Sequence, residues 1–184
     1  MSRPENAAVH RRPRRRTPRE REATARHEAG HAVVCHHLLG SVRRVDITET
    51  ADALGSCEGP DLRLTLNPGE ALSPAGREKV ERRIMVLLAG PIAERQLSGR
   101  YCHVGASHDY QVSFHLASVY CQSDASAEAF LKWLWVRTEE LLELPFVRGR
   151  VDAVAMALLE RGELSGREVR RIVCETDTRE AHAS

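Results

Sequence analysis

The chain has 184 residues, enough for one domain with a hydrophobic core, and its net charge is only +1. Its five cysteines are an odd number and form no CxxC pair, which argues against a disulfide framework and favours a reducing, cytoplasmic location. The longest apolar run, around residues 84–93, is too short to span a bilayer, and no apolar run follows the basic N-terminus as in a signal peptide. We therefore expect a soluble protein.

The charge is unevenly distributed along the chain. Residues 1–21 carry eight arginines against two glutamates, whereas the remainder is mildly acidic. We expect a basic, disordered arm over residues 1–17, a globular domain over 18–178 and a flexible C-terminus over 179–184. The arm is either a solvated tail or a weak contact for nucleic acid or an anionic surface, and it has no interleaved aromatics for base stacking. The arginines considered for such a contact are Arg11, Arg12, Arg14, Arg15 and Arg16 in the arm and Arg19 and Arg21 just beyond it.

The first predicted helix runs from Thr17 to Gly40. Thr17 and Glu20 form a capping box with Pro18 at the first helical position, and Gly40 is a suitable C-terminal cap. Gly30 is the one poor helix former inside, and it costs about 1 kcal/mol relative to alanine. We therefore expect another backbone to approach the helix closely at Gly30.

A change of hydrophobic period after this helix predicts a small sheet. Residues 42–48 alternate as a strand does, residues 54–57 are a short second candidate, and the leucines of 62–66 suggest a third strand. Asn67, Pro68 and Gly69 then supply turn chemistry. The sheet would be inserted between helices.

The rest of the chain has helical spacing. Pro91 should kink the next helix or split it in two. After a loop at 100–105, either Ser107 or Asp109 could start the following helix, and Ser165 with Glu168 forms a second capping box. The predicted helical segments are, in order, 74–98, 107–119, 124–144, 147–161 and 165–174.

Residues 27–31 read HEAGH, an instance of HExxH on the first predicted helix. Positions i and i+4 share a helix face, so His27 and His31 can point at one metal ion. Glu28 would then act on a water molecule as general base. The pattern arises by chance about 0.05 times in a chain of this composition. The alternative is a surface helix with two solvated histidines.

Spacing alone does not choose a third ligand. Cys35 lies on the same stripe as both histidines, but it is about 12 Å from His27 along the helix axis, so it is better read as a core residue. His36 and His37 are too close to the motif and on the wrong sides of the helix. The other carboxylates, histidines and cysteines remain candidates.

Several segments resemble, in the same order, the protease domain of the FtsH family of membrane-anchored, ATP-dependent zinc proteases. The resemblance covers roughly residues 20–175 and implies a mainly α, helical zincin-like peptidase domain with a small inserted β-sheet at about residues 42–66. The matching segments are HEAGHA at 27–32, the strand-like segments 45–47 and 53–55, LAGPIAE at 88–94, GASHD at 105–109 and the helical region 142–171.

The resemblance also assigns roles to individual residues. It makes Asp109 the third Zn²⁺ ligand beside His27 and His31, with an open position for water. It makes Glu28 the catalytic residue. It places Glu94 close to the metal, where it would orient a ligand histidine, although a solvated helix glutamate is the alternative.

The resemblance further implies an edge strand that pairs with extended substrate, for which Leu54, Gly55 and Ser56 are the candidates. Two positions depart from the family pattern: His108 stands where the family has asparagine, and Pro91 where it has arginine. We interpret His108 as a surface change rather than a substrate contact or an accessory ligand.

These residues predict a zinc-dependent endopeptidase that hydrolyses peptides or unstructured polypeptides. The family's GxxxxGK[ST] phosphate loop does not occur in the printed sequence, so we expect cleavage to be ATP-independent in itself and a separate unfoldase or adaptor to be a partner. FtsH proteins form hexamers, so an oligomer is a further expectation. The alternative is a catalytically silent, zinc-stabilised interaction or adaptor module with the same fold.

Overall fold

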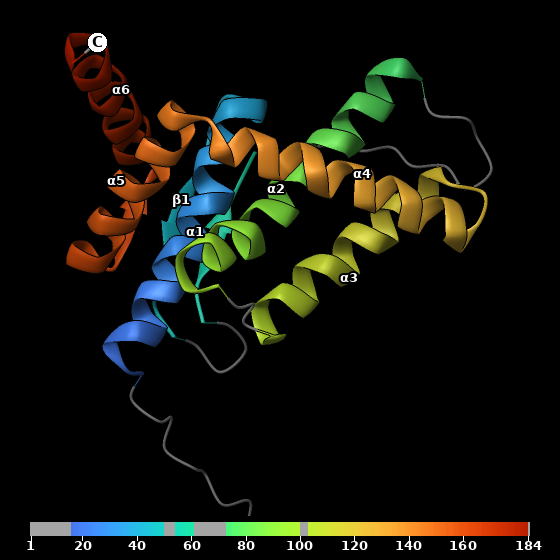
Figure 1. Ribbon diagram of the computed structural model, residues 1–184, viewed down its shortest axis with the longest axis horizontal. Coiled ribbons are helices and arrows are strands. Elements are labelled where there is room, and N and C mark those ends of the chain that lie inside the picture. The colour runs from blue at the N-terminus through green and yellow to red at the C-terminus, as the bar shows by residue number, and fades with distance from the viewer. Residues whose placement is uncertain (1–15, 50–53, 61–72, 100–102, 184) are drawn as a thin grey trace, which may run out of the picture.

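The computed structural model describes residues 16–49, 54–60, 73–99 and 103–183, and in this part of the chain it contains six helices and three short strands (Figure 1). The prediction of a mainly helical protein with one small sheet is therefore confirmed. Residues 1–15 of the predicted arm lie outside the described residues. The elements are α1 (Pro18–Leu39), β1 (Arg44–Asp46), β2 (Ser56–Glu58), α2 (Pro74–Ser98), α3 (His103–Tyr120), α4 (Asp124–Glu143), α5 (Pro145–Arg161), β3 (Glu163–Ser165) and α6 (Gly166–Ala183).

Helix α1 has the ends that its sequence predicts. The Thr17 side chain accepts a hydrogen bond from the Glu20 backbone N–H, and the Glu20 carboxylate accepts one from the Thr17 N–H at 2.7 Å. Gly40 ends the helix with φ of 77°, a conformation that glycine adopts without steric cost. These caps satisfy backbone groups that would otherwise lack partners at the two helix ends.

Helix α2 packs along α1 at very short range. A Cβ atom at Gly30 would lie 2.6 Å from the carbonyl oxygen of Ala89 and 2.7 Å from the Cβ of Ala93, so only glycine fits there. The expected close approach at Gly30 is thus present. Helix α2 is continuous from Pro74 to Ser98, so Pro91 does not split it. The largest fully buried side chains of α2 are Ile84, Leu88 and Ile92.

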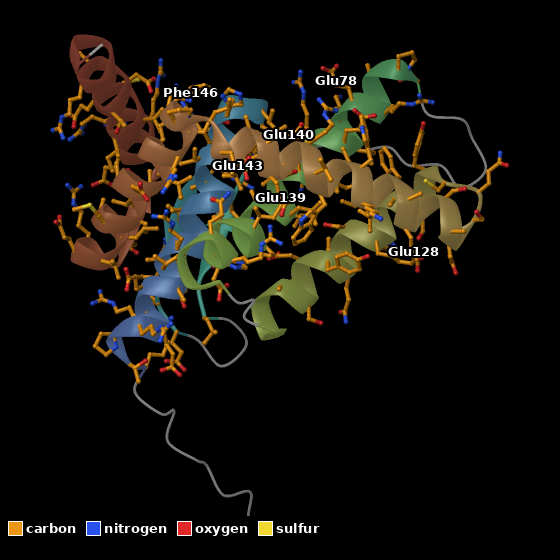
Figure 2. The ribbon with its side chains drawn as sticks, in the orientation of Figure 1. Glu78, Glu128, Glu139, Glu140, Glu143 and Phe146 are labelled. Atoms are coloured by element: carbon orange, nitrogen blue, oxygen red, sulfur yellow. The ribbon has the colours of Figure 1, made fainter. Side chains whose placement is uncertain are left out.

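The remaining helices surround this pair. Helices α3 and α4 pack on α2, whereas α5 packs on α1 and α6 packs on α5 (Figure 1). Figure 2 shows Glu139, Glu140 and Glu143 along α4, and Glu139 forms an ion pair with Arg95 of α2. No helix in the described ranges is both long enough and apolar enough to cross a membrane.

The sheet is antiparallel, with the strand order β2-β1-β3. Val45 of β1 is opposite Cys57 of β2 on one side and Leu164 of β3 on the other. The predicted sheet at about residues 42–66 contributes β1 and β2, but the third described strand, β3, lies outside that region, just before α6. Leu164 is buried, but a three-residue strand is too short to show an alternating pattern in sequence. The predicted strand at 62–66 lies outside the described residues.

Two further boundaries differ from the predicted ones. Helix α3 begins at His103 rather than at Ser107 or Asp109, so Asp109 lies inside the helix and not at its cap. Helix α6 continues past residue 174 to Ala183. Its predicted capping box is present, because the Glu168 carboxylate accepts a hydrogen bond from the Ser165 backbone N–H at 2.8 Å.

Candidate metal centre

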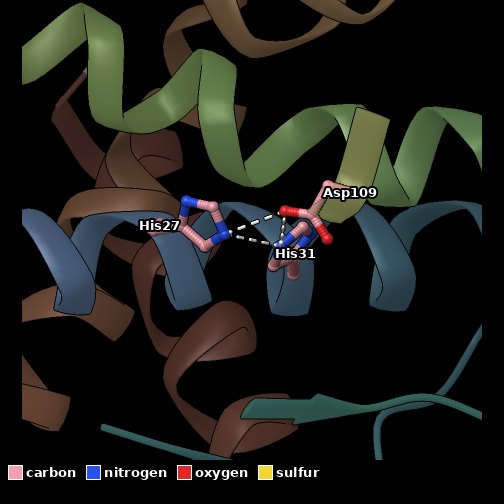
Figure 3. A group of neighbouring side chains, drawn as sticks. All are labelled: His27, His31 and Asp109. Atoms are coloured by element: carbon pink, nitrogen blue, oxygen red, sulfur yellow. Dashed lines mark hydrogen bonds and ion pairs between the residues drawn. The ribbon is translucent and has the colours of Figure 1, made fainter. Parts of the chain in front are cut away.

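Two histidines from α1 and one aspartate from α3 converge in the interior of the protein (Figure 3). His27 and His31 lie one turn apart on the face of α1 that is covered by α2, and Asp109 reaches them from α3. Their exposed fractions are 8%, 7% and 8%, respectively. Such burial is at odds with the alternative of a surface helix with two solvated histidines.

The three atoms that could bind a metal form a small triangle. His27 Nε2 lies 3.0 Å from His31 Nε2 and 3.0 Å from Asp109 Oδ2, and His31 Nε2 lies 3.2 Å from Asp109 Oδ2. Ligand atoms bound tetrahedrally to zinc at about 2.0–2.1 Å are roughly 3.3 Å apart. The triangle therefore has close to the dimensions that a tetrahedral zinc site requires, with its fourth position left for water or substrate.

The outer nitrogen of each imidazole has a hydrogen-bond acceptor. His27 Nδ1 lies 3.1 Å from Glu94 Oε2, and His31 Nδ1 lies 2.7 Å from the Val86 carbonyl oxygen. We assign a proton to each Nδ1 from these partners, since an acceptor must face a donor. The two Nε2 atoms then present lone pairs to the centre of the triangle, as metal-binding histidines do.

The three side chains suit a metal ion, because their close arrangement is electrostatically unfavourable when no cation lies between them. Asp109 Oδ2 is buried and has no hydrogen-bond donor when both Nε2 atoms are unprotonated. Three lone-pair atoms within 3.2 Å of one another need a positive charge between them. Two imidazoles and one carboxylate are ligands that zinc accepts.

In the metal-free protein a proton supplies this charge. Burial lowers the pKa of His27, but hydrogen bonds with Asp109 and Glu94 and the nearby Glu28 carboxylate outweigh burial and raise it to about 10. Burial would raise the pKa of Asp109, but the His31 and His27 imidazoles lower it below its ordinary value. The site therefore retains an ionised Asp109, and a metal ion would displace a proton from His27.

The Glu28 carboxylate lies near His31 and His27 of the candidate metal site and near Gly55. Its carboxylate abuts Gly55, where a Cβ atom would lie only 2.8 Å from Glu28 Oε1. Burial raises the pKa of Glu28 and outweighs the lowering by His31 and His27. A buried carboxylate with a raised pKa is suited to accept and return a proton near neutral pH.

The candidate metal centre also requires glycine at position 90, a requirement that we did not predict from the sequence. A Cβ atom at this position would lie 2.3 Å from His31 Nε2 and 2.8 Å from His27 Nε2, so α2 can pass the imidazoles only with glycine there. The small residues around it, in LAGPIAE, were a signal for close packing. The role of the Val86 carbonyl had no sequence signal at all, because any residue supplies one.

The other candidate ligands do not join the triangle. Among the described side chains, His27, His31 and Asp109 form the one group of three or more that could hold a metal. Cys35 is a buried core residue, as expected, and its thiol lies 3.3 Å from the Ser41 carbonyl oxygen. Side chains outside the cluster also include the exposed His37, His108 and His115 and the half-buried His36.

The predicted edge segment is only partly a strand. Strand β2 begins at Ser56, whereas Leu54 and Gly55 lie just before it. Since β2 is an outer strand of the described sheet, one of its edges faces away from β1. The chain thus passes beside Glu28 at Gly55 and then continues into β2, an outer strand of the described sheet.

Comparison with known proteins finds relatives that match part of the chain. Over 100 residues the chain is 34% identical to a protein of Rhodopirellula baltica (strain DSM 10527 / NCIMB 13988 / SH1) described as ATP-dependent zinc metalloprotease FtsH 1. The matched stretch is 53% of this chain and 14% of that protein, so the chain spans only a small part of its relative's length. No family model matches the chain. The chain is therefore similar to a portion of a zinc metalloprotease.

Proposed function

We propose that this chain is a zinc-dependent endopeptidase that hydrolyses peptide bonds in peptides or unstructured polypeptides. The observation that carries the proposal is the convergence of His27, His31 and Asp109 on one point, with Glu28 buried beside them. The similarity to a portion of a zinc metalloprotease supports the same chemistry. A purely structural site would use Glu94 to orient His27, whereas a second buried carboxylate beside the ligands, Glu28, suits general-base catalysis.

In this mechanism the two imidazoles and Asp109 hold the ion, and Glu94 and the Val86 carbonyl fix the imidazoles in the tautomer that leaves Nε2 free. When bound, zinc supplies Lewis acidity to the reacting water and to the peptide carbonyl. Glu28 accepts a proton from the attacking water and then donates it to the leaving amine. Its burial keeps bulk water from competing for that proton.

The substrate would bind as an extended strand along the segment that leads into β2. A polypeptide in this conformation can pair backbone to backbone with an outer strand. Gly55 has no side chain, so the backbone of the segment can lie against Glu28. This geometry favours flexible or unfolded chains, because a folded protein does not offer a free extended backbone.

Cleavage itself uses no nucleotide in this proposal. The matched relative is an ATP-dependent enzyme, but the printed sequence of this chain carries no GxxxxGK[ST] phosphate loop. We propose that the cutting step uses only the candidate metal site and Glu28, and that folded substrates require a separate unfoldase or adaptor that exposes an extended backbone.

The test combines metal analysis with cleavage of an unstructured protein. Wild type should bind one zinc and cleave, whereas Glu28→Gln should bind zinc equally and lose about 10²–10⁴-fold in kcat, the usual range for a general base. A zinc-loaded wild type that cuts no unstructured polypeptide would overturn the proposal in favour of a zinc-stabilised interaction module. Equal cleavage by Glu28→Gln would remove Glu28 from the mechanism.

A further inference from the structure

Arg16 connects the start of α1 to the segment around the sheet. Its Nη1 donates to the Leu54 carbonyl at 2.9 Å and to the Thr24 hydroxyl at 3.0 Å. Its Nη2 donates to the Ile47 carbonyl at 2.6 Å, and its Nε lies 3.4 Å from the Glu49 carboxylate. The Arg16 side chain is only 15% exposed. All of these partners lie within the chain, so the Arg16 guanidinium is already bound internally.

The guanidinium lies close to the proposed active site. Thr24 precedes Glu28 by one helical turn, so both side chains occupy the same face of α1. Leu54, which accepts from Arg16, is joined directly to Gly55, which abuts the Glu28 carboxylate. A single side chain thus links the helix that carries the candidate base to the segment where substrate would bind.

Leu54 and Gly55 lie outside the hydrogen-bonded ladder of the sheet. The pairing of β2 with β1 starts at Ser56, and Leu54 is 37% exposed. The charged guanidinium therefore provides an attachment that the strand pairing does not, and hydrogen bonds from a charged donor are stronger than those from neutral ones. The planar fork of arginine can reach the Ile47 and Leu54 carbonyls at the same time, and these two residues lie on either side of residues 50–53.

We propose that Arg16 is a positioning residue, which holds the Leu54–Ser56 segment at the distance from Glu28 that a bound polypeptide strand requires. This inference rests on the proposed function, since it assumes that the segment binds substrate. Arg16 touches neither the metal ligands nor the scissile bond in this proposal. Its loss should weaken peptide binding more than it slows the chemical step.

Binding is measured in a Glu28→Gln background, so that cleavage is not needed for the result. A fluorescein-labelled unstructured peptide is titrated with the zinc-loaded parent, and with the same protein carrying Arg16→Ala, Arg16→Lys or Arg19→Ala. Arg19 is an exposed arginine in the first turn of α1 and is the matched control. We expect Kd to rise about tenfold for Arg16→Ala, less for Arg16→Lys, and not at all for Arg19→Ala.

Two further readouts distinguish positioning from a general loss of structure. Zinc content should stay the same in all variants, whereas backbone amides of 54–58 should exchange faster in Arg16→Ala than in Arg19→Ala. With Glu28 present, Arg16→Ala should raise KM by a similar factor and change kcat little.

The binding and cleavage results test the role of Arg16 and the proposed function separately. An unchanged Kd for Arg16→Ala, or no peptide binding by the parent, overturns the inference even if wild type cleaves. Absence of cleavage by wild type overturns the proposed function, while the binding series still decides the role of Arg16. If Arg16→Ala loses its zinc, Arg16→Lys decides: binding with the parent's affinity overturns the proposal, and weaker binding with zinc retained supports it.

Discussion

The Nδ1 atom of His27 lies 3.1 Å from Oε2 of Glu94, and this contact joins α1 to α2 directly behind the metal-binding triangle. Glu94 is 5% exposed, so the alternative of a solvated helix glutamate does not describe it. A buried carboxylate that accepts from a ligand imidazole fixes the ring orientation and raises the basicity of the other nitrogen.

Substitution Glu94→Gln should weaken zinc binding about 10- to 100-fold, because the amide is a weaker acceptor for the His27 Nδ1 proton. Competition with a chromophoric chelator measures this change. Glu78→Gln, on the exposed side of the same helix, is the control and should bind zinc as wild type does. An affinity unchanged by Glu94→Gln would show that this contact does not tune the site.

Asp109 and His108 are neighbours with opposite environments, which makes them a matched pair. Asp109→Asn should abolish stoichiometric zinc binding at neutral pH, because the variant keeps the shape of the side chain but removes its charge. His108→Asn should retain zinc, since His108 is exposed and outside the triangle. Metal analysis after dialysis distinguishes the two, and zinc loss in both would point to damage to α3 instead.

The stability of the metal-free protein should depend on pH through His27. Its pKa is raised from 6.5 to about 10 in the folded state, so the folded protein binds this proton more tightly than the unfolded chain does. The resulting stabilisation is fully present below about pH 6.5 and is lost as pH rises through about 10. Urea unfolding of the metal-free protein across this range measures the loss, and His27→Gln should flatten the dependence.

The same raised pKa couples zinc binding to proton release. At neutral pH the ion should displace the proton from His27, so the apparent zinc affinity should fall as pH is lowered. Calorimetric titrations in buffers with different ionisation enthalpies count the released protons. Zinc binding with no proton release at neutral pH would contradict a protonated His27 in the metal-free protein.

Two glycines at the contact between α1 and α2 should have separable roles. Gly90→Ala would place a methyl group 2.3 Å from His31 Nε2, so we expect zinc affinity to fall at least about tenfold. Gly30→Ala would meet the Ala89 carbonyl and the Ala93 side chain instead, and it should chiefly lower stability by about 1–3 kcal/mol, as overpacking does. Thermal unfolding and zinc titration of both variants test this. Full zinc affinity in Gly90→Ala would mean that α2 can move away from His31.

Local signals in the sequence predicted most of the helices. The Thr17–Glu20 and Ser165–Glu168 capping boxes and the glycine at position 40 act within a few residues, so they can be recognised without the fold. The start of α3 was predicted too late because Ser107 and Asp109 are residues that favour caps. Asp109 instead projects from within the helix, where tertiary contacts with α1 decide its place.

The candidate site was predictable only in part. HExxH spacing places two imidazoles on one face of α1, but no spacing rule joins that face to an aspartate on α3; Asp109 was a candidate through family resemblance. The need for glycine at position 90 and the contacts of Arg16 follow from the packing of separate segments. Such relationships arise only when the chain is folded, so no local pattern in the sequence encodes them.

β3 comes late in the sequence, and this position determines when the sheet can be completed during synthesis. β1 lies between β2 and β3, yet β3 comes only just before the last helix of the chain. During synthesis the HEAGH helix emerges well before β3, so the sheet beside it remains incomplete until residues 163–165 have been translated. The order of synthesis therefore delays completion of the sheet that lies beside the candidate metal centre.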